Sequence, residues 1–272
     1  MKLIYMTDIH LDHCDMDTVS KFESDLNATS SSSDVLLVGG DLGNSENLIS
    51  VLTLLSKVWS RNVYFVLGNH DYYGSGFMST DIRATAFTKR HENSHMIYLG
   101  QTDGIFQLDM DTCLIGCNGW GDATEGDYWN TNVVLNDVKY IDDLKGKSAQ
   151  DIYMEMYYQG RKSAEQLQLT LSNPAIDIYN NIIVLTHVPP YLDAAWHEGK
   201  LSSPNYSPFF VCGQVGEVLS KFMEDRGNVN MTVLCGHTHS MGACTMGRHH
   251  NINVVTTGAI YGEPKFITMD SI

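Results

Sequence analysis

The sequence is short of positive charge. Its 272 residues include 17 Lys and Arg against 32 Asp and Glu, which gives a formal net charge of −15. A surface with this balance repels polyanions, so the composition argues against a protein that tracks along nucleic acid. The excess is also local, because residues 103–143 contain nine acidic side chains and one basic side chain, Lys139. Bound cations would offset part of this negative charge.

Long apolar runs are also missing. No segment reaches the roughly 20 apolar residues that a membrane-spanning helix needs, and the first residues, MKLIYMTDIH, lack the apolar stretch and cleavage pattern of a signal peptide. We therefore expect a soluble, cytoplasmic protein with no membrane contact. The 43% of hydrophobic residues is nevertheless enough for a sizeable core, and the composition does not indicate disorder.

The sequence also lacks cysteine pairs with the spacing of metal-binding or redox motifs. The six cysteines are scattered and form no CxxC motif, so we expect reduced, mostly buried thiols. The chain contains no internal repeat and has the length of one large domain, which predicts a single domain over residues 1–272. Within it, the irregular segments 118–148 and 188–212 are expected on the substrate side, since loops on a rigid scaffold often carry binding surfaces.

Short apolar runs that predict β-strands recur along the chain, and several are continuous, as in strands buried on both faces. They cover residues 2–6, 34–39, 62–67, 96–99, 104–109, 112–117, 181–186, 231–235, 252–257 and 265–270. Helical patterns lie between them at 16–28, 45–59, 79–91, 149–172 and 213–225. The early β-α-β-α-β order indicates an α/β fold, and the closely spaced runs within 96–117 and 252–270 predict hairpins or meanders in a mixed sandwich.

Five of the predicted strands end in side chains that can bind metal ions. A single such motif is most often an ordinary turn or surface pair, but a whole series at strand ends is not. In chain order the candidates are Asp8, His10, Asp41, Asn69, His187, His237 and His239, and His70 follows Asn69 in the sequence GNHD. Gly40, Gly68 and Gly236 stand just before ligands, where tight backbone turns are expected.

Two carboxylates, four imidazoles and one amide are too many ligands for one tetrahedral ion. They suit two ions that share a bridging carboxylate. Two divalent ions carry four positive charges; Asp8, Asp41 and a bridging hydroxide remove three, which leaves about one net positive charge for an anionic phosphate. The net charge of such a site would be positive, whereas that of the whole protein is negative.

The order D-x-H, GD, GNHD, H and GHTH, from Asp8 to His239, resembles that of the calcineurin-like metallophosphoesterase superfamily. The resemblance implies a four-layer αββα sandwich of two mixed β-sheets flanked by helices, with a dinuclear site at one edge. It further implies two divalent ions, manganese, iron or zinc. One would be held by Asp8, His10, Asp41 and His239, and the other by Asp41, Asn69, His187 and His237. His70 would bind no metal, but would protonate the leaving oxygen or stabilise phosphate charge.

The chain departs from the family pattern at Asn44. Many members carry an aspartate three residues after the GD aspartate, where it supports the GNH histidine. Asn44 either gives His70 weaker support or caps the helix predicted at 45–59. The sequences GDLGNSE and GNHD also differ from the GDxVDRG and GNHE of protein Ser/Thr phosphatases, which favours the bacterial and phage phosphodiesterase-type members.

Aromatic residues in the two irregular segments have two interpretations. Trp120, Tyr128 and Trp129 either form a wall for a flat substrate group or pack the insert onto the core, and packing is favoured because aromatic side chains prefer burial. Residues of the second segment could line the other side, namely Tyr191, Trp196, His197 and Tyr206, with His197 read as a surface residue. No substrate-binding residue is predicted.

The leading functional hypothesis is hydrolysis of a small soluble phosphate ester, a diester in preference to a monoester, by attack of a metal-bridging hydroxide. A nuclease of the same superfamily is the alternative, which the missing basic residues disfavour. A protein phosphatase or a non-catalytic binding scaffold is less favoured. A scaffold would be expected to lose ligands or the acid, whereas all of these residues are present.

Overall fold

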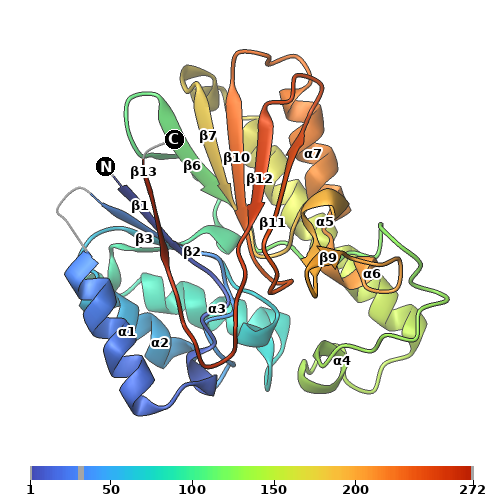
Figure 1. The fold of residues 1–272 in the computed structure, drawn as a ribbon, viewed down its shortest axis with the longest axis horizontal. Helices are drawn as coiled ribbons and strands as arrows, with labels where there is room; N and C mark the ends of the chain where they lie inside the picture. The colour runs from blue at the N-terminus through green and yellow to red at the C-terminus, as the bar shows by residue number, and fades with distance from the viewer. Residues whose placement is uncertain (1, 30–33, 271–272) are drawn as a thin grey trace.

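Two β-sheets pack face to face, and helices cover their outer faces, in the computed structural model of residues 2–29 and 34–270 (Figure 1). The first sheet has the strand order β13-β1-β2-β3-β4, and the second has the order β11-β12-β10-β7-β6-β5. The predicted four-layer αββα sandwich is confirmed. Among the helices of the described residues, none has the length and apolar character needed to cross a membrane.

The strands are short and nearly all were predicted from the apolar runs. The first sheet consists of β1 (Lys2–Met6), β2 (Val35–Val38), β3 (Val63–Phe65), β4 (Met96–Tyr98) and β13 (Ile267–Asp270). The second consists of β5 (Phe106–Gln107), β6 (Thr112–Gly116), β7 (Asn181–Leu185), β10 (Asn230–Cys235), β11 (Gly242–Met246) and β12 (Ile252–Thr256). The run at 96–99 thus belongs to the first sheet and the run at 104–109 to the second.

Strand alternation divides the apolar side chains among three cores. Along β1, Leu3 and Tyr5 face the second sheet, whereas Ile4 and Met6 face helices α1 (Met16–Thr29), α2 (Leu48–Val58) and α3 (Phe77–Thr88). The outer face of the second sheet packs on α5 (Ala149–Leu171) and α7 (Gly213–Met223). Each sheet is therefore buried on both faces, which explains the continuous apolar runs.

The hairpins or meanders predicted at 96–117 and 252–270 are only partly present. β4 pairs with β3 in the first sheet, so within 96–117 the hairpin is confined to β5 and β6. Likewise β12 pairs with β11 and β10, whereas β13 crosses to the first sheet and pairs antiparallel with β1. In both places the connection is long enough to reach the other sheet, so closeness along the chain does not decide which strands pair.

The five predicted long helices are present with shifted ends. α2 begins at Leu48 because residues 45–47 form a separate turn. The Asn44 side-chain oxygen accepts hydrogen bonds from the N–H groups of Glu46 and Asn47, and so caps this turn. All six cysteines are free, and Cys113, Cys117, Cys212 and Cys235 are buried, as predicted.

The two irregular segments pair with each other beside the sandwich. The first contains the short helix α4 (Asp137–Tyr140), and the second contains β8 (Trp196–His197), β9 (Lys200–Leu201) and α6 (Ser207–Phe210). Backbone N–H groups of Asp122, Ala123 and Asp127 donate to carbonyl oxygens of the second segment, at Val211, Pro208 and Pro204. Both segments lie on the same side of the molecule, next to the ends of the parallel strands (Figure 1).

Candidate metal centre

The carboxyl ends of five parallel strands converge at one edge of the sandwich. β1, β2 and β3 run parallel in the first sheet, and β7 and β10 run parallel in the second. The side chains that follow these strands form two groups of possible metal ligands, Asp8, His10, Asp41 and His239, and Asp41, His187 and His237. The same division into two groups with a shared aspartate was predicted from the family resemblance.

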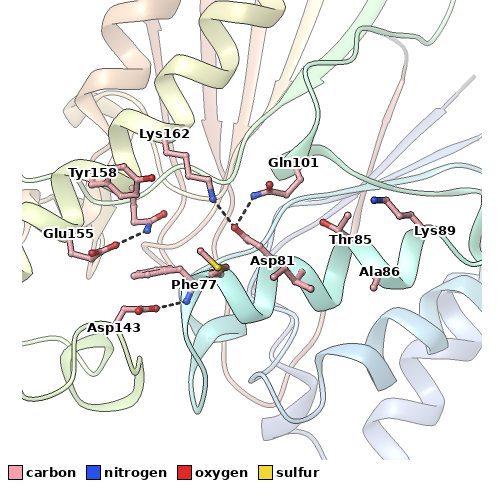
Figure 2. A pocket seen from close by; sticks show the side chains of 13 residues that line it. Phe77, Asp81, Thr85, Ala86, Lys89, Gln101, Asp143, Glu155, Tyr158 and Lys162 are labelled. Atoms are coloured by element: carbon pink, nitrogen blue, oxygen red, sulfur yellow. Dashed lines mark hydrogen bonds and ion pairs between the residues drawn. The ribbon is translucent and has the colours of Figure 1, made fainter.

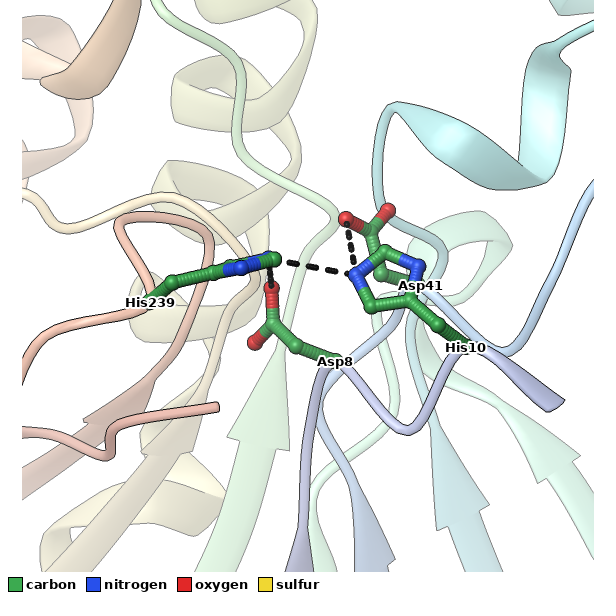
Figure 3. Close-up of side chains that lie close together, drawn as sticks. All are labelled: Asp8, His10, Asp41 and His239. Carbon is green, nitrogen blue, oxygen red and sulfur yellow. Dashed lines mark hydrogen bonds and ion pairs between the residues drawn. The ribbon is translucent and has the colours of Figure 1, made fainter. Parts of the chain in front are cut away.

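The first group is compact and points inward (Figure 3). His10 Nε2 lies 3.1 Å from His239 Nε2 and 3.7 Å from Asp41 Oδ2. His239 Nε2 lies 3.3 Å from Asp8 Oδ1. Two imidazole nitrogens that face each other between two carboxylates are a donor set that a cation would complete.

The second group shares its carboxylate oxygen with the first. Asp41 Oδ2 lies 3.5 Å from His187 Nε2, and it is the same oxygen that faces His10. The predicted amide ligand also belongs here, because Asn69 Oδ1 lies 2.9 Å from His237 Nδ1 and 3.3 Å from His187 Nε2. All seven candidate ligands are thus brought together, with Asp41 between the two groups.

The backbone is strained at the candidate ligands. Five of them have positive φ angles, namely Asp8 (52°), His10 (40°), Asp41 (53°), His237 (70°) and His239 (57°). The left-handed region costs an L-residue roughly 1–2 kcal/mol. Strain of this kind persists where surrounding structure enforces it, and it is typical of functional sites.

Two histidines of the second group have their free nitrogen fixed by a backbone carbonyl. His187 Nδ1 lies 2.8 Å from Gly39 O, and His237 Nε2 lies 3.0 Å from Phe209 O. Each of these nitrogens must carry the proton to donate, which leaves the other nitrogen as an acceptor toward the centre. Outer hydrogen bonds that fix the tautomer in this way are characteristic of metal-binding histidines.

The electrostatics of the centre also fit bound cations. Asp8 and Asp41 are 2% and 1% exposed. Burial opposes the ionisation of Asp8, but its bond with His239 and nearby imidazole charge lower its pKa to about 2. Burial likewise lowers the pKa of His187, yet the Asp41 carboxylate raises it to about 10. In ion-free protein a proton on His187 therefore balances Asp41, and a metal ion would replace that proton. Two ligand groups that share Asp41 fit a dinuclear site for divalent ions.

Asp71, the last residue of GNHD, ties two of the strand ends together. Its buried carboxylate accepts hydrogen bonds from the backbone N–H groups of Asp41 and Gly68 through Oδ2, at 2.9 and 2.8 Å. Through Oδ1 it accepts from Leu42 and Gly43 at 2.9 and 3.3 Å. No role was predicted for Asp71. Hydrogen bonds from backbone N–H groups to a carboxylate are strong, and here they hold two loops together.

His70 lies beside the first group rather than within it. Its backbone N–H donates to Asp41 Oδ1 at 2.8 Å, and its ring is 4.5 Å from that of His10 and 4.3 Å from that of Tyr73. The hydroxyl of Tyr261 lies 3.4 Å from His70 Nε2. Tyr261, on the connection between β12 and β13, was missed because no motif marks it.

Asn44 takes part in a different network. Besides capping the turn before α2, its amide donates to Asp12 Oδ2 at 3.2 Å. Among residues 2–29 and 34–270, no hydrogen bond joins its side chain to His70. Asn44 thus caps the turn before α2, and not the helix itself, whose N-cap residue is Asn47.

Two adjoining cavities open at the centre. The first, of about 260 Å³, is lined by Asp41, Asn69, His237 and His239 together with Leu135, Asn136, Asp137, His197 and Phe210. The second, of about 560 Å³, contains Asp12 and Glu46. Both include His70, Tyr73, Asn136 and Tyr261, so His70 stands where they meet. The described residues that line the two cavities include no Lys or Arg.

Trp120, Tyr128 and Trp129 form no wall beside the two cavities. Trp120 is 6% exposed and packs edge-on against Tyr72 and Phe77, while Tyr128 and Trp129 lie outside both cavities. Trp120 and the half-buried Tyr128 pack the insert onto the core, as the favoured interpretation predicts, whereas Trp129 is 58% exposed. From the second segment, His197 lines the first cavity, so it is a cavity residue rather than a plain surface residue.

A separate cavity of about 660 Å³ lies between α3 and α5 (Figure 2). It contains no candidate ligand. Its buried acid, Asp81, accepts four hydrogen bonds, from Lys162 Nζ, Gln101 Nε2 and the hydroxyls of Tyr72 and Tyr98. Because all four bonds are internal, Asp81 supports the packing of the GNHD loop on α5.

Comparisons with known proteins agree with this architecture. No curated protein matches the sequence. Two solved structures share the fold at low identity. A phosphopantetheinyl hydrolase from Mycobacterium tuberculosis is 15% identical with a TM-score of 0.63, covering 98% of this chain and 95% of its own. A dimetal phosphatase from Danio rerio is 14% identical with a TM-score of 0.55, covering 98% and 91%. The sequence itself matches the calcineurin-like phosphoesterase family over residues 1–241, and the protein therefore belongs to that family.

Proposed function

We propose that this protein hydrolyses a small soluble phosphate ester, a phosphodiester in preference to a monoester, with two divalent metal ions bound at the strand ends. The observation that carries the proposal is the single Asp41 oxygen that faces both ligand groups, 3.7 Å from His10 Nε2 and 3.5 Å from His187 Nε2. Manganese is the ion we expect to support activity in vitro, with iron and zinc as alternatives. A cytoplasmic location is part of the same proposal.

The chain's residues have separate tasks in this reaction. One ion would be held by Asp8, His10 and His239, and the other by Asn69, His187 and His237. Asp41 would bind both ions. When bound, such a pair of ions activates water at neutral pH and neutralises charge on the phosphoryl oxygens. His70 stands at the junction of the two cavities, from which it can donate a proton to the leaving oxygen.

The lining of the cavities favours a substrate with one phosphate. Substrates with several phosphates are usually bound by Lys and Arg, and the described lining residues include neither. The second cavity instead contains the carboxylates of Asp12 and Glu46, which repel further anionic groups. A polynucleotide substrate is disfavoured for the same reason.

The proposal is tested by purifying the protein with manganese and assaying bis-p-nitrophenyl phosphate. A panel of natural mono- and diesters, including cyclic nucleotides, then follows. We expect metal-dependent turnover that EDTA abolishes. Failure to turn over any ester with manganese, iron, cobalt or zinc would reject the proposal. Efficient oligonucleotide cleavage with steep salt dependence would instead identify a nuclease.

A further inference from the structure

The insert of residues 118–148 places one buried carboxylate against the candidate ligand Asn69. Asp137, the first residue of α4, is 8% exposed. Its Oδ1 accepts a hydrogen bond from Asn69 Nδ2 at 2.8 Å and another from the Tyr73 hydroxyl at 2.6 Å. No motif of the five strand ends includes this residue.

The bond to Asp137 decides which end of the Asn69 amide faces the centre. An amide presents an oxygen and an NH₂ group of nearly the same shape, and only the oxygen can bind a metal ion. Because Asp137 Oδ1 accepts from the NH₂ group, the Asn69 oxygen is directed toward His187 and His237, at 3.3 and 2.9 Å. A flip would place the NH₂ group at the centre.

Asp137 Oδ1 is also linked to His70, because it holds the Tyr73 ring that stacks on His70. The Tyr73 ring stacks on the ring of His70, with centroids 4.3 Å apart and planes inclined by 29°. Since the Tyr73 hydroxyl donates to Asp137 Oδ1, the ring that supports His70 is held by the atom that also orients Asn69.

The segment around Asp137 is itself held firmly. The backbone N–H of Gly74 donates to Tyr140 O at 2.8 Å, and that of Asp142 donates to Ser75 O at 2.9 Å. Asp143 accepts from the Phe77 N–H at 2.7 Å, and Ile141 is fully buried in the core under the first sheet. The insert is therefore fixed to the residues that directly follow GNHD, which gives Asp137 a defined position.

We propose that Asp137 is a positioning residue that sets the metal-binding orientation of Asn69 and holds the ring on which His70 stacks. This inference rests on the proposed function, because it presumes that Asn69 binds an ion. Both hydrogen bonds end on one oxygen, so the role requires an acceptor atom and not a negative charge. The insert thus completes the second metal site instead of only covering it.

The test compares two variants of similar shape. Asp137→Leu removes the acceptor, whereas Asp137→Asn keeps an acceptor oxygen and removes the charge. We expect Asp137→Leu to weaken binding of the second Mn²⁺ about 10–100-fold, as loss of an outer hydrogen bond usually does, and Asp137→Asn to change it less than about threefold. Binding is followed by chelator competition, and pairing of the ions by electron paramagnetic resonance, both independent of turnover. Asp142→Asn, an exposed acid of the same insert, is the control.

The outcomes separate this inference from the proposed function. Wild-type protein that never binds two ions refutes the proposed function. If wild type and Asp137→Leu bind both ions equally well, only the role of Asp137 is refuted. If Asp137→Leu and Asp137→Asn lose metal affinity equally, the charge of Asp137 is the cause, and the proposed acceptor role is refuted too. If Asp137→Leu does not fold, Asp137→Ala replaces it, because the residue lines a cavity that water can fill. Tyr73→Phe should keep both ions and lower kcat, and loss of an ion there would contradict the inference.

Discussion

At the scale of single residues, His70 is set apart from the ligands that surround it. It touches Asp41 only through its backbone N–H, and its ring lies between Tyr73 and His10, at the junction of the two cavities. A side chain in this place can act on the substrate without holding an ion.

His70→Asn is therefore expected to retain both metal ions and to lose about 10²–10⁴-fold in kcat, the usual contribution of general acid catalysis. The measurement is single-turnover hydrolysis of an alkyl phosphate ester, alongside metal analysis. A nitrophenyl ester is a poor probe, since its good leaving group needs little protonation. An unchanged rate on the alkyl ester would reject the role of His70 as acid.

Asp71 stabilises the same region through four backbone N–H groups. Asp71→Asn turns an NH₂ group toward two of these donors, so we expect a loss of about 3 kcal/mol in the free energy of unfolding. Urea denaturation measures it, with the exposed Asp103→Asn as the matched control. Equal midpoints for the two variants would show that Asp71 does not hold the loops.

At the scale of elements, the strand ends must approach one another closely for the ligands to meet. Gly68 illustrates the limit, because a Cβ atom there would overlap Asp41 Oδ1 and His187 Nε2. Both neighbours are candidate ligands, so neither can move away without opening the centre.

Gly68→Ala should accordingly fold but bind metal at least about tenfold more weakly, since displaced ligands lose their geometry. The comparison is Gly227→Ala, where the added Cβ would stand 3.3 Å from the exposed His249 ring. Metal content after dialysis distinguishes the two. Full occupancy in Gly68→Ala would mean that the strand ends are more adaptable than their packing indicates.

At the scale of the whole molecule, the negative charge of the chain and the expected positive charge of its centre are coupled. Without bound ions, the centre depends on protons to balance its buried carboxylates. Although burial lowers the pKa of His187, Asp41 raises it to about 10, above the ordinary value of about 6.5. Because its pKa is raised in the folded protein, protonated His187 stabilises the folded state. This stabilisation is complete below about pH 6.5 and is lost as the pH rises toward 10.

We expect opposite pH trends with and without metal. In EDTA the Tm should fall as the pH is raised from about 6.5 toward 10, because the unfolded chain releases the proton that His187 retains in the folded centre. With Mn²⁺ the gain in Tm over the EDTA sample should increase across the same range, since a neutral imidazole binds the ion. Thermal scanning at several pH values checks both trends. A Tm in EDTA that stays level or rises would contradict the proposed balance of charge.

Much of the fold could be read from the sequence, because its strands are buried on both faces and so appear as continuous apolar runs. The run at 2–6 became β1 without any shift. β11 was missed because Gly242–Met246 is half exposed and contains no Val, Ile, Leu or aromatic residue. The assignment of β12 and β13 to different sheets also escaped prediction, since it depends on which surface each strand covers and not on sequence distance.

The sequence by itself determined the α/β class, the strands that end in possible ligands and the family to which those motifs point, because metal chemistry restricts residue types and strand ends restrict spacing. Only the tertiary structure decided which side chains surround them. Asp71 belongs to GNHD but had no predicted role, and Asp137 and Tyr261 belong to no motif. All three reach the centre through hydrogen bonds or ring contacts with residues distant in the chain. Their roles arise from packing between segments, and that information appears only when the chain is folded.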